Sequence, residues 1–199
     1  MRYPPDQKAK AREALLKAGA CSLKTSGFNG IGVDGLAGAA GVTSGAFYSN
    51  FPTKEAMLEA VVEAFVGEPF VSDTGSVTVA EGRSCLQDFL DDYISIDHSA
   101  DPAQGCVMPA LSADVSRAQP PVKEAYGRKI STLAQRLASL LGGDPSDRER
   151  RAWSMVALMV GAIAISRAMP EHSESRTTSL DAARSTAIRL IENEPGDTC

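Results

Sequence analysis

The chain has 199 residues and a net charge of −5 at neutral pH, and 43% of its residues are hydrophobic and 23% charged. These proportions exclude a disordered chain, and the length suits one ordinary domain or a small module joined to a larger one. The first residues are charged and contain no apolar segment with a cleavage site, so no secretory signal is expected. We expect a soluble, cytoplasmic protein with a hydrophobic core.

The charge is distributed unevenly along the chain. Residues 1–60 contain seven Lys and Arg against five Asp and Glu, a balance of +2, whereas the other residues contain 13 against 20, a balance of −7. Only the first part could therefore favour a polyanion such as nucleic acid.

Cysteine and histidine do not form a pattern that is typical of a metal site. The four cysteines are Cys21, Cys85, Cys106 and Cys199. They form no CxxC pair, and His98 and His172 lie in polar stretches away from them, so neither a zinc site nor a disulfide framework is predicted. Free thiols in a reducing compartment fit better, and we expect no metal and no cofactor.

Helical spacing recurs along the chain, and no convincing strand pattern is present. The first helix should run from about Pro5 or Asp6 to Ser26, with Gly27 closing it. Three short segments follow by residue 66. Longer helices are predicted at 85–96, 106–117, 122–141, 148–169 and 180–193. Loops are predicted at 67–82, 97–105, 142–147 and 170–178.

Residues 33–51, VDGLAGAAGVTSGAFYSNF, are typical of two short helices joined by a tight turn. Leu36 and the alanines around it form a small apolar face on the first helix. Gly41 should end that helix, because glycine readily adopts the positive φ that the turn needs. Val42 and Phe47 are placed to pack back on the apolar face. The pattern predicts a helix-turn-helix.

The second short helix begins with side chains that are almost too small to pack. Thr43 is well placed as its N-cap. The first turn then consists of Ser44, Gly45 and Ala46. Such a turn lets backbone and base edges approach each other in a major groove, as a recognition helix requires. Farther round the helix, Tyr48 and Asn50 could reach phosphates or bases.

Lys54 follows directly after this motif. Pro52 breaks the second short helix, and Thr53 is expected to cap the next one, KEAMLEAVVEAF. Lys54 then lies in the first turn of that helix, where a bound phosphate would face both the ammonium group and the helix N–H groups. The alternative is an exposed lysine without a function, which costs a helix only a few tenths of a kcal/mol.

Together these features carry a resemblance to a known family. Residues 10–66, and AGVTSGAFYSNFPTKEAML above all, resemble the DNA-binding head of the TetR family of transcriptional regulators. The resemblance implies DNA contacts by Thr43, Ser44, Gly45, Ala46, Tyr48, Asn50 and Lys54. Phe47 and Phe51 are expected in the core.

The head departs from the family pattern at three places. Before the helix at Val33, the family commonly has a threonine that caps the helix and touches phosphate, but here Ile31 and Gly32 precede it. Ser44 often corresponds to a basic residue in relatives. Gly35 and Gly38 weaken the first helix of the motif by up to about 1 kcal/mol each relative to Ala. We expect modest electrostatic affinity for DNA.

The family resemblance implies an all-α chain, with an N-terminal three-helix helix-turn-helix head and a larger helical body for ligand binding and dimerisation. The expected boundaries are 1–52 for the DNA-binding domain, 53–66 for a connecting helix and 67–199 for the body. The segment WSMVALMVGAIAISRAM is apolar nearly all round and must be covered on more than one side. Relatives pair two subunits through their last two long helices, so a homodimer on symmetric half-sites is predicted.

The implied function is a repressor that leaves a palindromic operator when a small molecule, whose identity the sequence does not reveal, binds the body. Candidate pocket residues are Phe89, Tyr93, Cys106, Met108, Tyr126, Trp153 and Met159. Each of them is more often plain core than pocket wall.

Cys106 leaves two interpretations open, and two other classes of protein are alternatives to a regulator. A thiol at a helix start can be a reactive sensor of electrophiles or oxidants, but free cysteine is more often an inert core residue. A thiol enzyme would need a base near Cys106, and the spacing of His98 and His172 brings none there. We therefore expect no enzyme; a helical small-molecule carrier that does not bind DNA is the other alternative.

Overall fold

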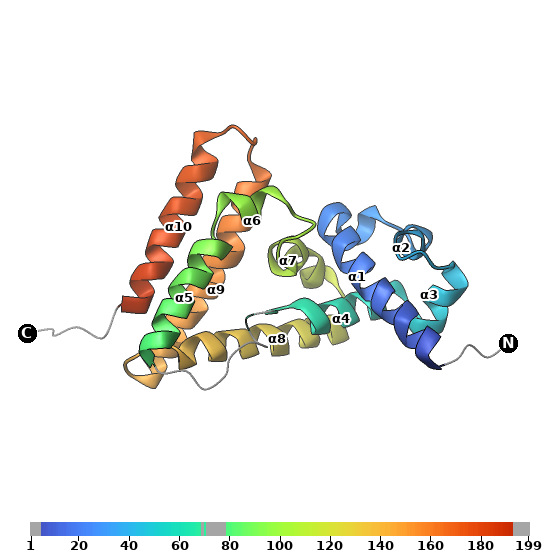
Figure 1. Cartoon of the computed structure of the whole chain (residues 1–199), viewed down its shortest axis with the longest axis horizontal. Helices are drawn as coiled ribbons and strands as arrows, with labels where there is room; N and C mark the ends of the chain where they lie inside the picture. The colour runs from blue at the N-terminus through green and yellow to red at the C-terminus, as the bar shows by residue number, and fades with distance from the viewer. Residues whose placement is uncertain (1–4, 69, 71–78, 193–199) are drawn as a thin grey trace, which may run out of the picture. The chain divides into compact units, whose positions relative to one another are not determined.

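A computed structural model describes residues 5–68, 70 and 79–192, and it is all-helical, with no strand in that part of the chain (Figure 1). Its helices are α1 (Pro5–Gly30), α2 (Val33–Ala39), α3 (Ser44–Asn50), α4 (Lys54–Phe65), α5 (Val79–Tyr93), α6 (Ile96–Ala100), α7 (Val107–Arg117), α8 (Pro120–Ser139), α9 (Pro145–Ala168) and α10 (Glu174–Glu192). The all-α fold class predicted from the sequence, with a helix-turn-helix head and a helical body, is confirmed.

Packing divides the chain into two compact units. The first consists of Met1–Glu68 and Pro102–Lys129, and the second of Pro69–Asp101 and Ile130–Cys199. The helices α1 to α4 thus share a unit with α7 and the first half of α8. This is a division by contacts; the functional boundary at residue 67 stays a prediction.

The core of the first unit forms around α1. Leu15 and Leu23 are buried on its inner face. Gly19 lets α4 approach closely, because a Cβ at this position would lie 2.0 Å from the terminal methyl of Met57. The short helices α2 and α3 pack on α1, and α7 packs on it as well.

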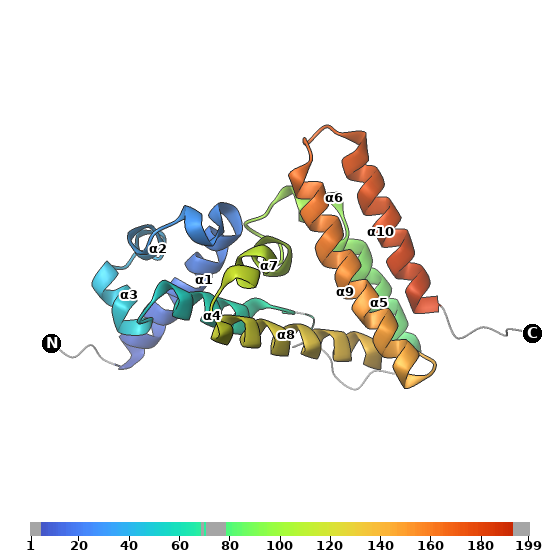
Figure 2. The ribbon, with the colours of Figure 1, turned by 180° about the vertical axis from the view of Figure 1, so that it is seen from behind.

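The second unit is built on α9, α10 and α5, which run side by side in both views of the ribbon (Figures 1 and 2). Arg151 of α9 is only 1% exposed, and its guanidinium has three partners. It pairs with Asp147 at 2.7 Å and donates to the carbonyls of Leu190 and Gly142. A buried charge is tolerable only when it is paired and hydrogen-bonded in this way, so Arg151 fixes the start of α9 to the end of α10.

Helix α6 corrects one prediction, because residues 97–100 fall in the segment predicted as a loop. Ser95 caps α6 by accepting a hydrogen bond from the His98 N–H at 3.1 Å. Ser99 is buried and its hydroxyl lies 2.6 Å from that of Ser166 on α9. The guanidinium of Arg176, on α10, donates to both hydroxyls. Polar contacts hold α6 in place, so apolar spacing could not reveal it.

Other helix boundaries differ from the predictions by a few residues at their starts. α9 begins at Pro145, because Asp144 accepts a hydrogen bond from the Ser146 N–H at 2.9 Å and caps the helix. α10 begins at Glu174, inside the loop predicted at 170–178, and α5 begins at Val79. The rest of the loop predicted at 67–82 lies mostly outside the described residues. Gly27 does interrupt α1, with φ 71° and ψ 167°.

Among the described residues, α9 alone is long and apolar enough to cross a membrane. This is weak support for a span, because the core helix of a soluble protein meets the same criterion. Here Met155, Val156, Met159 and Ile163 of α9 are buried within the chain, whereas Trp153 and Ile165 are exposed. The helix fits a soluble protein.

Candidate nucleic-acid interface

The turn between α2 and α3 has the geometry that the sequence predicted. Gly41 has φ 67°, a region that glycine enters without steric cost. Its N–H donates to the Gly38 carbonyl at 3.0 Å, and the Val42 N–H donates to the Ala37 carbonyl at 2.9 Å. These bonds close the C-terminus of α2 and direct the chain into α3.

The inner face of α3 is held by two aromatic side chains. Phe47 is fully buried and Phe51 is 2% exposed. Their ring centroids lie 5.8 Å apart, and both were expected in the core. Thr43 is the N-cap, since its Oγ1 accepts from the Ala46 N–H at 3.2 Å. The orientation of α3 is thus set by its buried side and its cap.

The outer edge of α3 is open. Tyr48 is 57% exposed. A Cβ on Gly45 would meet only Thr43 Oγ1, at an ordinary 3.7 Å. Packing within the chain therefore does not require glycine at position 45, and the space beside it is open to close approach from outside the chain.

Ser44, the first residue of α3, is tied to α2. Its Oγ donates to Asp34 Oδ1 at 2.5 Å. Asp34 is exposed and lies in the first turn of α2. The N-cap residue of that helix is Gly32, which provides no side-chain cap, as the sequence predicted. Asp34 could not be predicted as a partner of Ser44 from the sequence, because the two residues lie ten positions apart and only the turn brings them together.

Asn50, at the end of α3, is turned inward. Its Nδ2 donates to the Ala46 carbonyl at 2.8 Å, and its Oδ1 is buried without a hydrogen-bond partner. Arg12 of α1 donates to the Asn50 carbonyl at 3.1 Å and lies over the Phe51 ring at 4.4 Å. The predicted DNA contact of Asn50 stays a prediction and needs a different rotamer. Arg12 is thus a basic residue beside α3 that the sequence pattern did not indicate.

Lys54 has a partner inside the head. Its Nζ donates to the Phe28 carbonyl and lies 4.2 Å from the centre of the Phe28 ring. Thr53 caps α4 as predicted, its hydroxyl accepting from the Ala56 N–H at 3.0 Å. An ammonium group has three donors, so these contacts leave capacity for a phosphate. The contact of Lys54 with DNA stays a prediction.

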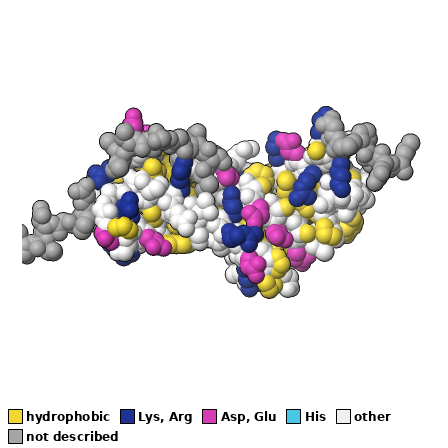
Figure 3. Space-filling model, turned by 90° about the horizontal axis from the view of Figure 1, so that it is seen from below, with side chains coloured by type: hydrophobic (Ala, Val, Ile, Leu, Met, Phe, Trp, Pro, Cys, Tyr) yellow, Lys and Arg dark blue, Asp and Glu magenta, His cyan; other side chains and the backbone are white. Residues whose placement is uncertain are grey.

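Basic and acidic side chains are interspersed on the face of the molecule that Figure 3 shows, so the described residues of this face form no patch of purely positive or purely negative charge. One pair on the first unit is Arg128 with Glu63, at 2.5 Å. The modest electrostatic affinity for DNA that was expected from the sequence stays a prediction.

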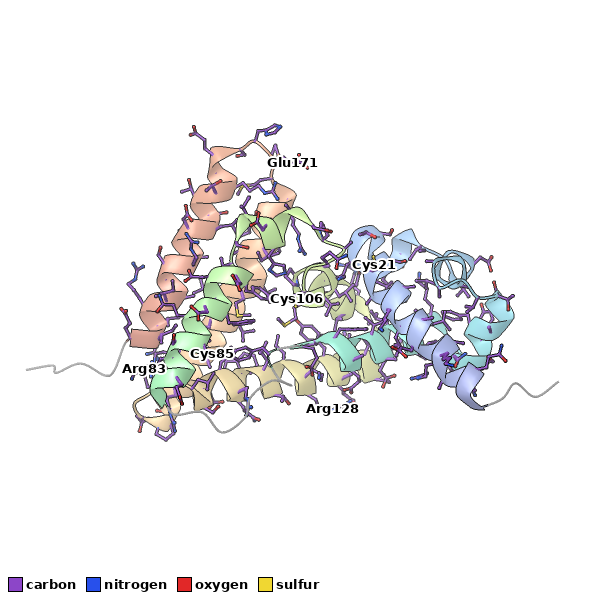
Figure 4. The ribbon with its side chains drawn as sticks, viewed as in Figure 1. Cys21, Arg83, Cys85, Cys106, Arg128 and Glu171 are labelled. Atoms are coloured by element: carbon purple, nitrogen blue, oxygen red, sulfur yellow. The ribbon has the colours of Figure 1, made fainter. Side chains whose placement is uncertain are left out.

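The candidate ligand residues fall in both units. Cys106, Met108 and Tyr126 belong to the first unit. Cys106 is the N-cap of α7, its Sγ accepting from the Met108 N–H at 3.4 Å (Figure 4). The Tyr126 hydroxyl lies 2.7 Å from that of Ser112. Burial raises the pKa of the Tyr126 hydroxyl above its ordinary value, and the hydrogen bond with Ser112 partly offsets this.

Phe89, Tyr93, Trp153 and Met159 belong to the second unit. The rings of Phe89 and Tyr93 continue a row of aromatic contacts from Phe70 to His98, with centroid separations of 4.3, 5.6 and 4.4 Å. Met159 is fully buried, whereas Trp153 is 39% exposed in the single chain. The role of these residues as a ligand pocket stays a prediction.

Two helices joined by a glycine turn, the second capped by threonine and presenting a small-residue edge, define a helix-turn-helix protein of the DNA-binding class. Residues 15–61 match the family described as bacterial regulatory proteins, tetR family. The sequence matches none of the curated proteins with which it was compared.

Solved structures share the fold over most of the chain. Escherichia coli NemR in its reduced form is 22% identical, with a TM-score of 0.71, over 91% of this chain and 96% of NemR. A TetR-family transcriptional regulator from Cytophaga hutchinsonii is 22% identical, with a TM-score of 0.69, over 96% and 97% of the two chains. Regulatory protein TetR from Rhodobacter sphaeroides is 22% identical, with a TM-score of 0.69, over 91% and 98%.

The family match covers the head, residues 15–61, which is a DNA-binding head of the tetR family, and the solved structures show that the chain as a whole shares their fold.

Proposed function

We propose that the protein is a homodimeric repressor, which binds a palindromic operator through two heads and releases it when a small molecule binds the body. The observation that carries the proposal is the open outer edge of α3, where no neighbouring atom of the chain restricts the size of residue 45. A recognition helix enters the major groove with its N-terminal residues toward the bases, and this is where Thr43, Ser44, Gly45 and Ala46 lie.

The same proposal assigns roles along the chain. We assign DNA binding to residues 1–52. Residues 53–66 form the helix that connects this head to the body, and residues 67–199 bind the effector and a second subunit. The heads are used in pairs because half-sites one DNA turn apart match the two-fold symmetry of a dimer. The last two long helices are α9 and α10, and α9 exposes Trp153 and Ile165 in the single chain. Burial of these side chains against a second copy would remove apolar surface from water. The protein would act in the cytoplasm, where the DNA is.

The test is binding of the full-length protein to the DNA upstream of its own gene, measured at low salt by gel shift or fluorescence anisotropy. We expect a shift with this DNA that a scrambled duplex does not compete away. Failure to shift any duplex would favour a helical carrier or a thiol enzyme instead.

A pair of variants locates the interface in the same assay. Tyr48→Glu adds a negative charge on the exposed side of α3, and Gln87→Glu adds the same charge on the exposed side of α5. We expect Tyr48→Glu to weaken binding at least about tenfold, because the carboxylate repels phosphate, and Gln87→Glu to leave binding unchanged. Equal effects of the two variants would contradict the placement of DNA on α3.

A further inference from the structure

The hydrogen bond between Ser44 and Asp34 determines which hydrogen-bond donors and acceptors remain available to a ligand at the start of α3. Ser44 Oγ donates to Asp34 Oδ1 at 2.5 Å, across the turn between the two short helices. This distance is typical of a hydroxyl that donates to an ionised carboxylate, which is a strong bond. Asp34 is exposed and Ser44 is half-buried, so both side chains reach the surface of the motif.

The chemistry of this pair is restricted to accepting hydrogen bonds. A serine hydroxyl has one proton, and an ionised carboxylate has none. Since Ser44 gives its proton to Asp34, the capacity that remains on both side chains consists of lone pairs. Thr43, next to Ser44, is different, because its Oγ1 accepts from the Ala46 N–H and keeps its own proton for donation. Thr43 is thus suited to a phosphate, and the pair of Asp34 and Ser44 is suited to a donor.

Only two bases present a donor in the major groove, namely cytosine with its N4 amino group and adenine with its N6 amino group. Guanine and thymine present acceptors at the corresponding places, which the carboxylate of Asp34 repels. Adenine also presents the N7 acceptor beside N6, and a good contact with both requires a donor. The pair has no donor left, and cytosine is therefore the base that it fits best.

We propose that Asp34 and Ser44 together select cytosine at one position of each operator half-site. This inference rests on the proposed function, since it requires that α3 enters the major groove. It makes Asp34 a determinant of sequence specificity, although its charge opposes binding to the phosphate backbone. The alternative is a purely structural role, in which Asp34 stabilises the start of α2 through the helix dipole and contacts no base.

The experiment is selection of binding sites from a randomised duplex library by the full-length protein and three variants. Asp34→Asn replaces one acceptor oxygen by an amide donor, and Ser44→Ala removes the hydroxyl. Asp97→Asn is the matched control, because Asp97 is also exposed in the first turn of a short helix, α6. Circular dichroism melting of every variant checks that it is folded.

We expect the wild type to select a palindrome with cytosine at the contacted position of each half. Asp34→Asn should move that preference toward adenine by about tenfold, because an asparagine amide can bond both N6 and N7. Ser44→Ala should weaken the cytosine preference by about fivefold at the same position, within the range of single base contacts. Asp97→Asn should select the wild-type sequence.

The outcomes separate this inference from the proposed function. If the wild type selects no sequence, DNA recognition itself fails. If the wild type selects a palindrome, but Asp34→Asn and Ser44→Ala select the same bases at every position, the protein reads DNA without this pair and the inference is wrong. A uniform loss of affinity with unchanged base preferences also overturns it, because Asp34 would then act only on the stability of α2.

Discussion

The Phe28 N–H donates to Asp114 Oδ2 at 2.9 Å, which links α1 to α7 at the point where α1 is interrupted. Gly27, with φ 71°, takes the chain out of helical geometry just before Phe28, and Asp114 supplies an acceptor for the N–H that follows. The carbonyl of the same residue accepts from Lys54. Phe28 therefore connects α7 with the lysine that is predicted to touch phosphate.

Asp114→Ala is expected to lower the free energy of unfolding by about 1.5–3 kcal/mol, the usual contribution of a hydrogen bond to a charged group. Asp181→Ala is the matched control. Each aspartate pairs with an arginine three residues later, Arg117 or Arg184, but the Asp114 side chain is 12% exposed and the Asp181 side chain 57%. An exposed pair contributes about 0–1 kcal/mol. Urea denaturation measures both, and equal losses would mean that the link to Phe28 contributes nothing.

Gly45→Ala separates folding from DNA binding. Alanine in a helix is more favourable than glycine by about 0.5–1 kcal/mol, and a Cβ at Gly45 meets no close atom. We expect unchanged or raised thermal stability together with affinity for DNA at least about tenfold weaker, because a close contact of the groove with α3 has no room for the methyl group.

The control for this substitution is Gly127→Ala in α8, where a Cβ would also meet nothing within 4 Å. It should raise the melting temperature and leave the affinity for DNA unchanged. Full affinity of Gly45→Ala would show that position 45 is not approached closely by DNA.

Lys54→Ala tests the phosphate contact through salt dependence. The slope of log affinity against log salt should fall in magnitude by roughly two units, because a dimer loses two phosphate contacts. Lys17→Ala removes the same charge from an exposed site on α1, where Lys17 pairs with Glu13, and should leave the slope unchanged. An unaltered slope for Lys54→Ala would mean that Lys54 serves only its contacts with Phe28.

Ile165→Glu tests the proposed dimer. Ile165 is 51% exposed on α9, and Ile96, on α6, is 43% exposed. A carboxylate at position 165 would be buried without a partner in a dimer through α9 and α10, which is costly. Sedimentation at micromolar concentration should give a monomer for Ile165→Glu and a dimer for Ile96→Glu and the wild type. A monomeric wild type would contradict the dimer altogether.

The cap of α9 predicts a dependence of stability on pH. The side-chain hydroxyl of Ser146 and then its N–H, both donating to Asp144, hold the pKa of that carboxyl below its ordinary 3.8. A pKa that is lower in the folded state stabilises the fold above the ordinary value, and this contribution is lost as the pH falls through the folded value.

Asp144→Asn keeps a capping oxygen without a titrating group. As the pH falls from about 5 to about 2, the melting temperature of the wild type should therefore decrease more than that of Asp144→Asn. Parallel curves for the two proteins over this range would show that the cap does not titrate as its hydrogen bonds require.

Features that depend on neighbours in the chain could be predicted from the sequence. The positive φ of Gly41, the caps at Thr43 and Thr53, and the burial of Phe47 follow from local rules of helix ends and helical spacing, and all were predicted and found. The resemblance of the head to one family was readable for the same reason.

Contacts between residues far apart in sequence could not be predicted in this way, because they arise from the packing of the folded chain. The bond of Ser44 to Asp34, the hold of Phe28 on Lys54, and the burial of Ser99 against Ser166 depend on how separate helices pack. Such polar contacts have no periodic pattern in the sequence, because a hydrogen bond needs one pair of atoms in place and not a repeated apolar face. Local spacing therefore predicted α3, the helix that we propose faces DNA, and packing decided which of its hydrogen-bonding atoms remain available to a ligand.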